Sequence, residues 1–79
     1  MVQVKVCGIT RAADAVAAVS LGATSIGFVF WPESRRYVTP DFAASIVQGL
    51  PTVRSVGVFV NSSVEEMHEV ADKVGLTSV

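Results

Sequence analysis

The sequence predicts an α/β fold in which parallel strands alternate with helices. Runs rich in valine and isoleucine begin near residues 2, 25, 54 and 78, and a segment of helical periodicity follows each of the first three. One strand and one helix together take roughly 25 residues, the spacing of parallel strands joined by helical crossovers. Because 51% of the 79 residues are hydrophobic, we expect a single unit with one core.

Three segments have the composition of strands. The first alternates apolar and polar residues, which places Gln3, Lys5 and Cys7 together on one face. The second and third are short and rich in β-branched or aromatic residues, and the second is expected to be buried on both faces. The strands are expected at residues 2–6, 26–30 and 54–60, with 77–79 as the start of a fourth.

A capping residue is expected at the start of each helix and a glycine at its end. The hydroxyl of threonine or serine can accept from the free amides of the first turn, and glycine readily adopts the left-handed conformation that closes the last. For the third helix, the serine can form a capping box with Glu65 or Glu66. The expected caps are Thr10, Thr39 and Ser62 or Ser63, and the expected ends are Gly22, Gly49 and Gly75.

Two architectures are built from such units, an open doubly wound sheet and a closed eight-stranded barrel. The polar face of the first strand favours the barrel, because a central strand of a doubly wound sheet is normally apolar on both sides. Residues 1–79 are then expected to form the first three βα units and the start of the fourth strand of a (β/α)8 TIM barrel, which does not close within this chain.

Composition argues against several classes of protein. Six basic and seven acidic residues are scattered along the chain, so no basic stripe predicts binding to nucleic acid. Residues 15–32 carry no charge, but Gly22 and Gly27 interrupt them, and we do not expect a membrane span. The single cysteine, Cys7, cannot form an internal disulfide, which together with the lack of a signal-peptide pattern predicts a cytoplasmic location.

Cys7 is the first candidate for chemistry, because it stands where the first strand ends. Loops at the carboxyl ends of parallel strands build the active sites of α/β folds. Lys5, on the same side of the strand, is a candidate cation that would favour the thiolate. The alternative is a buried, inert cysteine that packs as a small hydrophobe.

The loop after the second strand holds two adjacent arginines, Arg35 and Arg36, on the same expected rim as Cys7. Paired guanidinium groups can present bidentate donors to a carboxylate or phosphate, although a solvated charge pair is equally compatible with the composition. Trp31 is expected to cover the core edge rather than a ligand, and His68 to be a surface histidine. The sequence holds no glycine-rich phosphate loop and no metal-ligand spacing.

The segment from Lys5 to Arg11, KVCGITR, resembles the signature that opens phosphoribosylanthranilate isomerases. Further segments continue the resemblance in order through almost the whole chain: Asp14-Ala15, Leu21–Ala23, Gly27–Phe30, Ser34–Val38 and Val56–Asn61. The family usually has proline between the serine and the arginine of the fourth segment, where this chain has Arg35.

The resemblance implies a cofactor-independent Amadori rearrangement of N-(5-phosphoribosyl)anthranilate to 1-(2-carboxyphenylamino)-1-deoxyribulose 5-phosphate, in tryptophan biosynthesis. It implies that Cys7 is the general base and that Arg36 binds the anthranilate carboxylate, while Arg35 remains a second candidate. The family's general acid and phosphate-binding loops lie on later strands, so the isolated chain is expected to lack activity. The alternative is a non-catalytic βα unit that folds, self-associates or complements the missing part.

Overall fold

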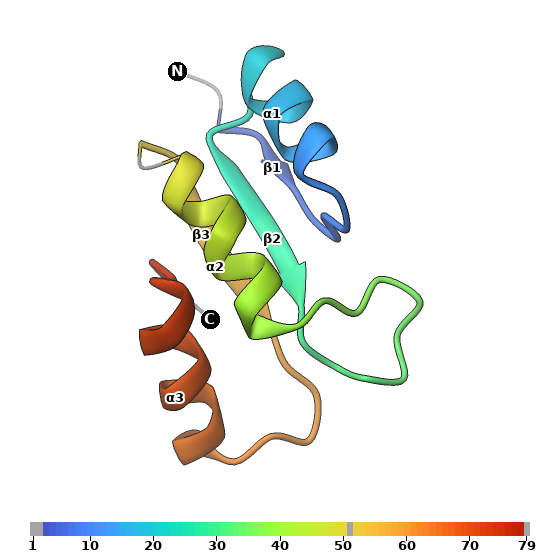
Figure 1. Ribbon diagram of the computed structural model, residues 1–79, viewed down its shortest axis with the longest axis vertical. Coiled ribbons are helices and arrows are strands. Elements are labelled where there is room, and N and C mark those ends of the chain that lie inside the picture. Colours follow the sequence, from blue (N-terminus) through green and yellow to red (C-terminus); the bar gives the residue numbers. More distant parts are fainter. Residues whose placement is uncertain (1–2, 51, 79) are drawn as a thin grey trace.

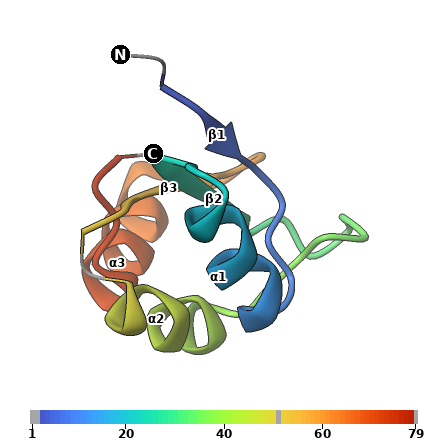
Figure 2. The ribbon, with the colours of Figure 1, turned by 90° about the horizontal axis from the view of Figure 1, so that it is seen from above.

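The computed structural model describes residues 3–50 and 52–78 as three parallel strands and three helices in alternation. The helices all lie on one side of the sheet, as Figures 1 and 2 show from two directions. The elements are β1 (Lys5–Val6), α1 (Ala12–Ser20), β2 (Ser25–Val29), α2 (Pro40–Gly49), β3 (Arg54–Val58) and α3 (Val64–Val74). The predicted order of elements is confirmed; β1 and β3 are shorter than expected, and β2 has the expected length but begins one residue earlier.

The strand order is β1-β2-β3, and both strand pairs are parallel. Val6 lies opposite Ile26, which in turn lies opposite Ser55. Beyond β3, Ser78 forms a parallel bridge with Val56, so the predicted fourth strand begins there, although Val79 lies outside the described residues. All carboxyl ends of the strands therefore lie at one edge of the sheet.

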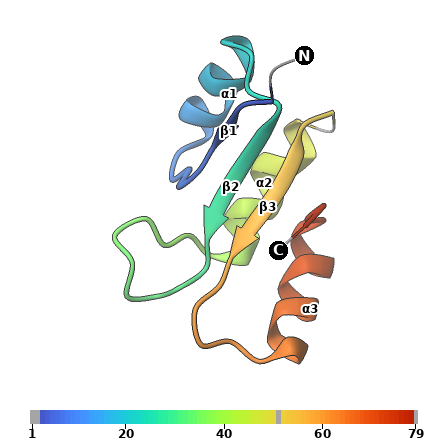
Figure 3. The ribbon, with the colours of Figure 1, turned by 180° about the vertical axis from the view of Figure 1, so that it is seen from behind.

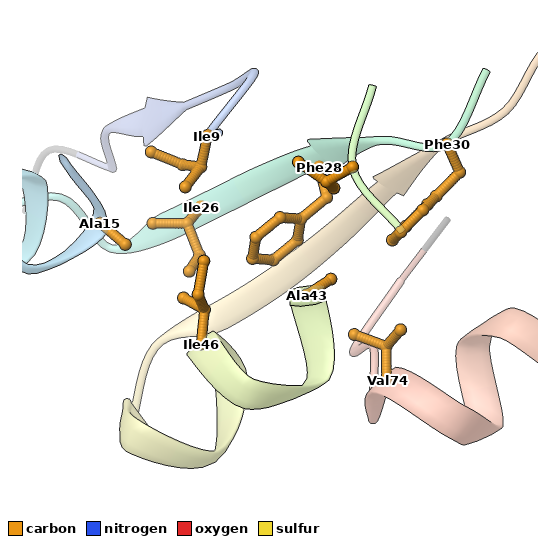
Figure 4. Packing of buried hydrophobic residues seen from close by; sticks show 9 residues of the cluster. Ile9, Ala15, Ile26, Phe28, Phe30, Ala43, Ile46 and Val74 are labelled. Atoms are coloured by element: carbon orange, nitrogen blue, oxygen red, sulfur yellow. The ribbon is translucent and has the colours of Figure 1, made fainter. Parts of the chain in front are cut away.

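The core lies between the sheet and the helices. Ile26 and Phe28 point from β2 toward the helices, where Ile46 and Ala43 of α2 meet them (Figure 4). Phe28 is fully buried, and its ring lies 6.3 Å from that of Phe30 between centroids. The alternation along β2 thus sends every second side chain into this core, as the strand period requires.

The opposite face of the sheet is open in the described structure, as Figure 3 shows from behind. Lys5, Cys7 and Arg54 lie on this face and are exposed. The prediction that the second strand is buried on both faces holds for Ile26, Gly27 and Phe28, whereas Ser25 and Val29 are only half-buried. In a closed barrel this face would line the interior.

Two of the three predicted helix starts are confirmed. Thr39 Oγ1 accepts a hydrogen bond from the Phe42 amide at 3.2 Å, with Pro40 as the first helical residue. Ser63 Oγ accepts from the Glu66 amide at 3.1 Å, which selects Ser63 over Ser62. In each case a side-chain oxygen satisfies an amide that has no partner within the helix.

The prediction that Thr10 caps α1 is wrong. The capping residue is Arg11, which is extended (φ −139°) and makes no side-chain cap. Its guanidinium instead forms two 3.0 Å hydrogen bonds to the Asp14 carboxylate. An ion pair on the helix surface therefore stands at the first turn where a hydroxyl cap was expected.

The end of α1 is a Schellman motif, as the glycine predicted. Gly22 has φ +104°, and its amide donates to Val19 O at 3.0 Å. The following amide, of Ala23, donates to Ala18 O at 2.9 Å. These two bonds satisfy carbonyls that the helix leaves free and turn the chain into β2.

Candidate functional site

The predicted meeting of the first two βα loops at one edge of the sheet is found in the structure. Cys7 follows the last residue of β1, and the long loop of residues 30–39 follows β2. Figure 1 shows the turn after β1 and this loop, in green, at the same end of the molecule. The thiol and the two arginines therefore emerge at a common edge rather than at opposite ends of the sheet.

The backbone after Cys7 is fixed against the neighbouring strand. The amides of Gly8 and Ile9 both donate to the carbonyl of Gly27, at 3.1 and 3.0 Å. Ile9 is buried in the core, which anchors the turn on the helix side. Cys7 is thus held between β1 and a fixed turn, with its side chain exposed on the open face.

Gly8 makes room for Arg36. Its φ of +81° lies in the left-handed region, which favours glycine. A Cβ on Gly8 would lie 2.6 Å from Cδ and 2.9 Å from Nη1 of Arg36, so the Arg36 side chain would have to shift to admit it. The Arg36 side chain therefore passes directly over the residue that follows Cys7.

A compact turn at Ser34 directs Arg36 toward Gly8. Its amide donates to Ser34 Oγ at 3.1 Å, and the amide of Tyr37 donates to Ser34 O at 3.2 Å. Tyr37 then forms a bridge with Val29, so the end of the loop returns to β2. The serine hydroxyl thus fixes the backbone from which the guanidinium projects.

The structure distinguishes the two candidate arginines. Both side chains are exposed, but Arg36 supplies the three atoms nearest to a Cβ on Gly8, and Arg35 supplies none of the nearest atoms at Gly8 or Gly27. Trp31 is half-buried at the start of the loop, where its carbonyl accepts from the Ser34 amide at 3.0 Å. The Arg36 guanidinium is thus placed beside the turn that carries the thiol.

Gly27 is a second glycine of the site that the sequence reasoning missed. A Cβ at this position would lie 3.0 Å from Cys7 Sγ and 3.3 Å from Lys5 Cε. A glycine inside a strand often marks the close approach of another group, and this was the available signal. Gly27 thus leaves the space that the Cys7 and Lys5 side chains occupy.

A third guanidinium near the site, that of Arg11, forms an ion pair with Asp14 at the start of α1. The hydrogen bond to Asp14, together with the charge of that carboxylate, raises the pKa of Arg11 above its ordinary value. Both side chains are largely exposed, so the pair contributes little to stability. Because the Arg11 guanidinium is paired with the Asp14 carboxylate, its charge is already balanced within the start of α1.

A groove of about 320 Å³ lies away from this site. It is formed by α3 and by the residues that begin the fourth strand, and His68 is part of its wall. Cys7 lies at the other edge of the sheet, beyond β2 and β3. His68 is exposed, as predicted for a surface histidine.

Further observations concern membranes and metals. No helix among the described residues is long and apolar enough to cross a membrane. Within residues 3–50 and 52–78, no three acidic, histidine or cysteine side chains gather in a group that could hold a metal ion.

Comparison with known proteins matches residues 4–79 to a family profile described as N-(5'-phosphoribosyl)anthranilate (PRA) isomerase. The N-(5'-phosphoribosyl)anthranilate isomerase of Nitrosomonas europaea is 50% identical over 95% of the chain, and that of Thermotoga neapolitana is 49% identical over all of it. The chain spans 36% and 39% of the length of these two relatives.

Solved structures are similar over the same portion. A phosphoribosyl anthranilate isomerase from Thermotoga maritima has a TM-score of 0.92 at 49% identity and aligns with 96% of the chain, which covers 38% of the solved protein. The isomerase from Thermus thermophilus has a TM-score of 0.90 at 43% identity and aligns with 95% of the chain, again 38% of that protein. A further structure, at TM-score 0.92, is of an isomerase in complex with reduced 1-(o-carboxyphenylamino)-1-deoxyribulose 5-phosphate.

Proposed function

Because the chain belongs to the N-(5'-phosphoribosyl)anthranilate isomerase family, we propose that it supplies the base and the carboxylate anchor of such an isomerase. Its fold is the N-terminal (βα)3 portion of a (β/α)8 barrel. The observation that carries the proposal is the position of Arg36, whose side chain crosses Gly8 next to Cys7. The proposed reaction is the Amadori rearrangement that serves tryptophan biosynthesis.

In the proposed mechanism, Cys7 is the general base. The ring-opened substrate is a Schiff base between anthranilate and C1 of the sugar, and the reaction requires loss of the proton from C2. A thiolate at the end of a strand can accept that proton, because its backbone is fixed while its side chain remains accessible. Rigid presentation of the base supports this role over that of a packing residue.

The redox balance of the rearrangement is internal to the substrate. C2 is oxidised from an alcohol to a ketone, while the C1–N double bond is reduced to a single bond as C1 gains a proton. No external oxidant or reductant is consumed, so we propose that the enzyme acts without a cofactor. What the protein supplies is proton transfer and positioning.

We propose that Arg36 binds the anthranilate carboxylate. A guanidinium donates two parallel hydrogen bonds to a carboxylate, which fixes both the position and the plane of the aromatic ring. The ligand of the similar solved structure carries such a carboxyphenyl group and a sugar phosphate. Arg35, one residue earlier and exposed, is proposed to stay outside this contact.

The remaining groups of the site are proposed to lie on later strands of the barrel. The Amadori reaction also needs a general acid and a site for the phosphate, and barrels frequently bind phosphate with the loops after strands seven and eight. We further propose that residues 1–79 act as one unit of this barrel domain and that the enzyme is cytoplasmic.

The open sheet face supports a second proposal, which concerns association. Apolar side chains of β2 and β3, including Val29, Val56 and Val58, are only half-buried on this face. We propose that the chain pairs either with the complementary part of a barrel or with a second copy of itself. A similar solved structure is of monomers generated from the dimeric isomerase of Thermotoga maritima, and that parent dimer is compatible with self-association.

The test of the proposed function is a chimera in which this chain replaces the equivalent segment of the Thermotoga maritima isomerase. At 49% identity and a TM-score of 0.92, the replacement preserves the backbone of the segment. We expect the chimera to convert N-(5'-phosphoribosyl)anthranilate and the Cys7→Ala chimera to bind it with strongly reduced turnover. A folded chimera whose activity does not depend on Cys7 would refute the assignment of the base.

A further inference from the structure

The side chains of Lys5 and Cys7 converge on one space above Gly27. A Cβ on Gly27 would lie 3.0 Å from Cys7 Sγ and 3.3 Å from Lys5 Cε. Lys5 lies two residues before Cys7 on the same side of its strand, and its long side chain extends along the sheet toward the edge that carries the thiol. The end of the Lys5 side chain therefore extends toward the sulfur, while Lys5 itself remains exposed.

Gly27 makes this convergence possible. A parallel strand places a side chain on each face at every second position, and β2 would present one between the two side chains of β1 if position 27 were not glycine. The neighbouring residues of β2 on the same face, Ser25 and Val29, do carry side chains. The absence of a side chain at Gly27 therefore leaves a gap on the open face of β2, beside the Cys7 thiol.

We infer that Lys5 stabilises the Cys7 thiolate through the space that Gly27 leaves free, and that it is a positioning residue for proton abstraction. A thiol can act as a base only in its deprotonated form, and a nearby cation favours that form. The catalytic part of this inference rests on the proposed function. The charge relationship itself does not, because it can be measured without substrate.

Other charged groups approach the thiol from neighbouring elements. Arg36 reaches Gly8 from the loop after β2, and Arg54 begins β3 on the same face, two strands away. Arg11, at the start of α1, is paired with Asp14. Lys5 differs from these groups because its side chain contacts the same space as the sulfur.

The test uses alkylation of Cys7, the one cysteine of the sequence, in the 79-residue chain. The ratio of the rate with anionic iodoacetate to the rate with neutral iodoacetamide reports positive charge at the thiol. For Lys5→Gln we expect this ratio to fall about threefold, the effect of one unit charge a few ångströms away in water. Lys5→Arg, which keeps the positive charge, should restore the wild-type ratio.

Two controls separate this effect from general charge and from sequence proximity. Arg54→Gln removes a cation from the same face and should leave the ratio unchanged. In concentrated urea the difference between wild type and Lys5→Gln should shrink, because the folded side-chain arrangement is lost. Gly27→Ala, which would force the two side chains apart, should lower the ratio in the folded chain as Lys5→Gln does.

Equal ratios for wild type and Lys5→Gln in the folded chain would overturn the inference. In the chimera, Lys5→Gln should lower kcat about threefold at neutral pH with little change in KM, since the charge acts on the base. An inactive chimera combined with a lowered alkylation ratio would reject the proposed function and leave the charge relationship intact. An unchanged kcat in an active chimera would reject the catalytic role of Lys5.

Discussion

Arg36 lies so close to Gly8 that a single methyl group at position 8 would collide with its Cδ. We therefore predict that Gly8→Ala raises the KM of the chimera, because the Arg36 side chain would have to shift from its place over Gly8. The substitution also forces alanine into a left-handed conformation, which costs about 1–3 kcal/mol of stability. Steady-state kinetics and urea unfolding measure the two effects.

Gly49→Ala is the matched control for this prediction. Gly49 ends α2, a Cβ there would have no neighbour within 4 Å, and its φ is not in the left-handed region. Alanine at this position should leave KM unchanged and stability equal or slightly higher. Equal kinetic effects of the two substitutions would show that Gly8 does not position Arg36.

The second prediction separates the two arginines of the loop. Arg36→Met should raise KM in the chimera by about 10- to 100-fold, the loss expected for hydrogen bonds to a charged group. Arg36→Lys should recover only part of this loss, because an ammonium cannot form the bidentate contact. Arg35→Met, made in the same exposed turn, should change KM less than about twofold.

A larger effect of Arg35→Met than of Arg36→Met would reverse the assignment.

The sequence could place both arginines on the rim, because the spacing of βα units brings the carboxyl ends of parallel strands to one edge. It could not choose between them. That choice depends on the turn at Ser34, whose hydroxyl accepts from the Arg36 amide, and on the close approach to Gly8.

Whether other features of the fold could be predicted from the sequence depends on similar physical reasons. The cap at Thr39 and the end at Gly22 follow from local chemistry, and both were predicted. The start of α1 was missed by one residue, because the turn of Gly8 and Ile9 is tied to Gly27 of another strand. A contact between distant segments of the chain leaves no local pattern at Thr10.

The third prediction concerns Cys7 in the chimera. Cys7→Ala should lower kcat by about 10²- to 10⁴-fold, the usual contribution of a general base, while KM changes little. Cys7→Asp, which offers a different base at the same position, should retain more activity than Cys7→Ala. A similar loss of thermal stability in both variants would point instead to a packing role, although the exposure of the side chain argues against one.

The fourth prediction compares two threonines as helix caps. Thr39→Ala removes the acceptor of the Phe42 amide and should destabilise the chain by about 1 kcal/mol in urea unfolding followed by circular dichroism. Thr10→Ala should cost much less, because Arg11 rather than Thr10 occupies the capping position of α1. Thr39→Ser, which keeps the hydroxyl, should behave nearly as wild type. If Thr10→Ala were as destabilising as Thr39→Ala, the hydroxyl of Thr10 would have to support α1 in solution, and the start of that helix at Ala12 would be wrong.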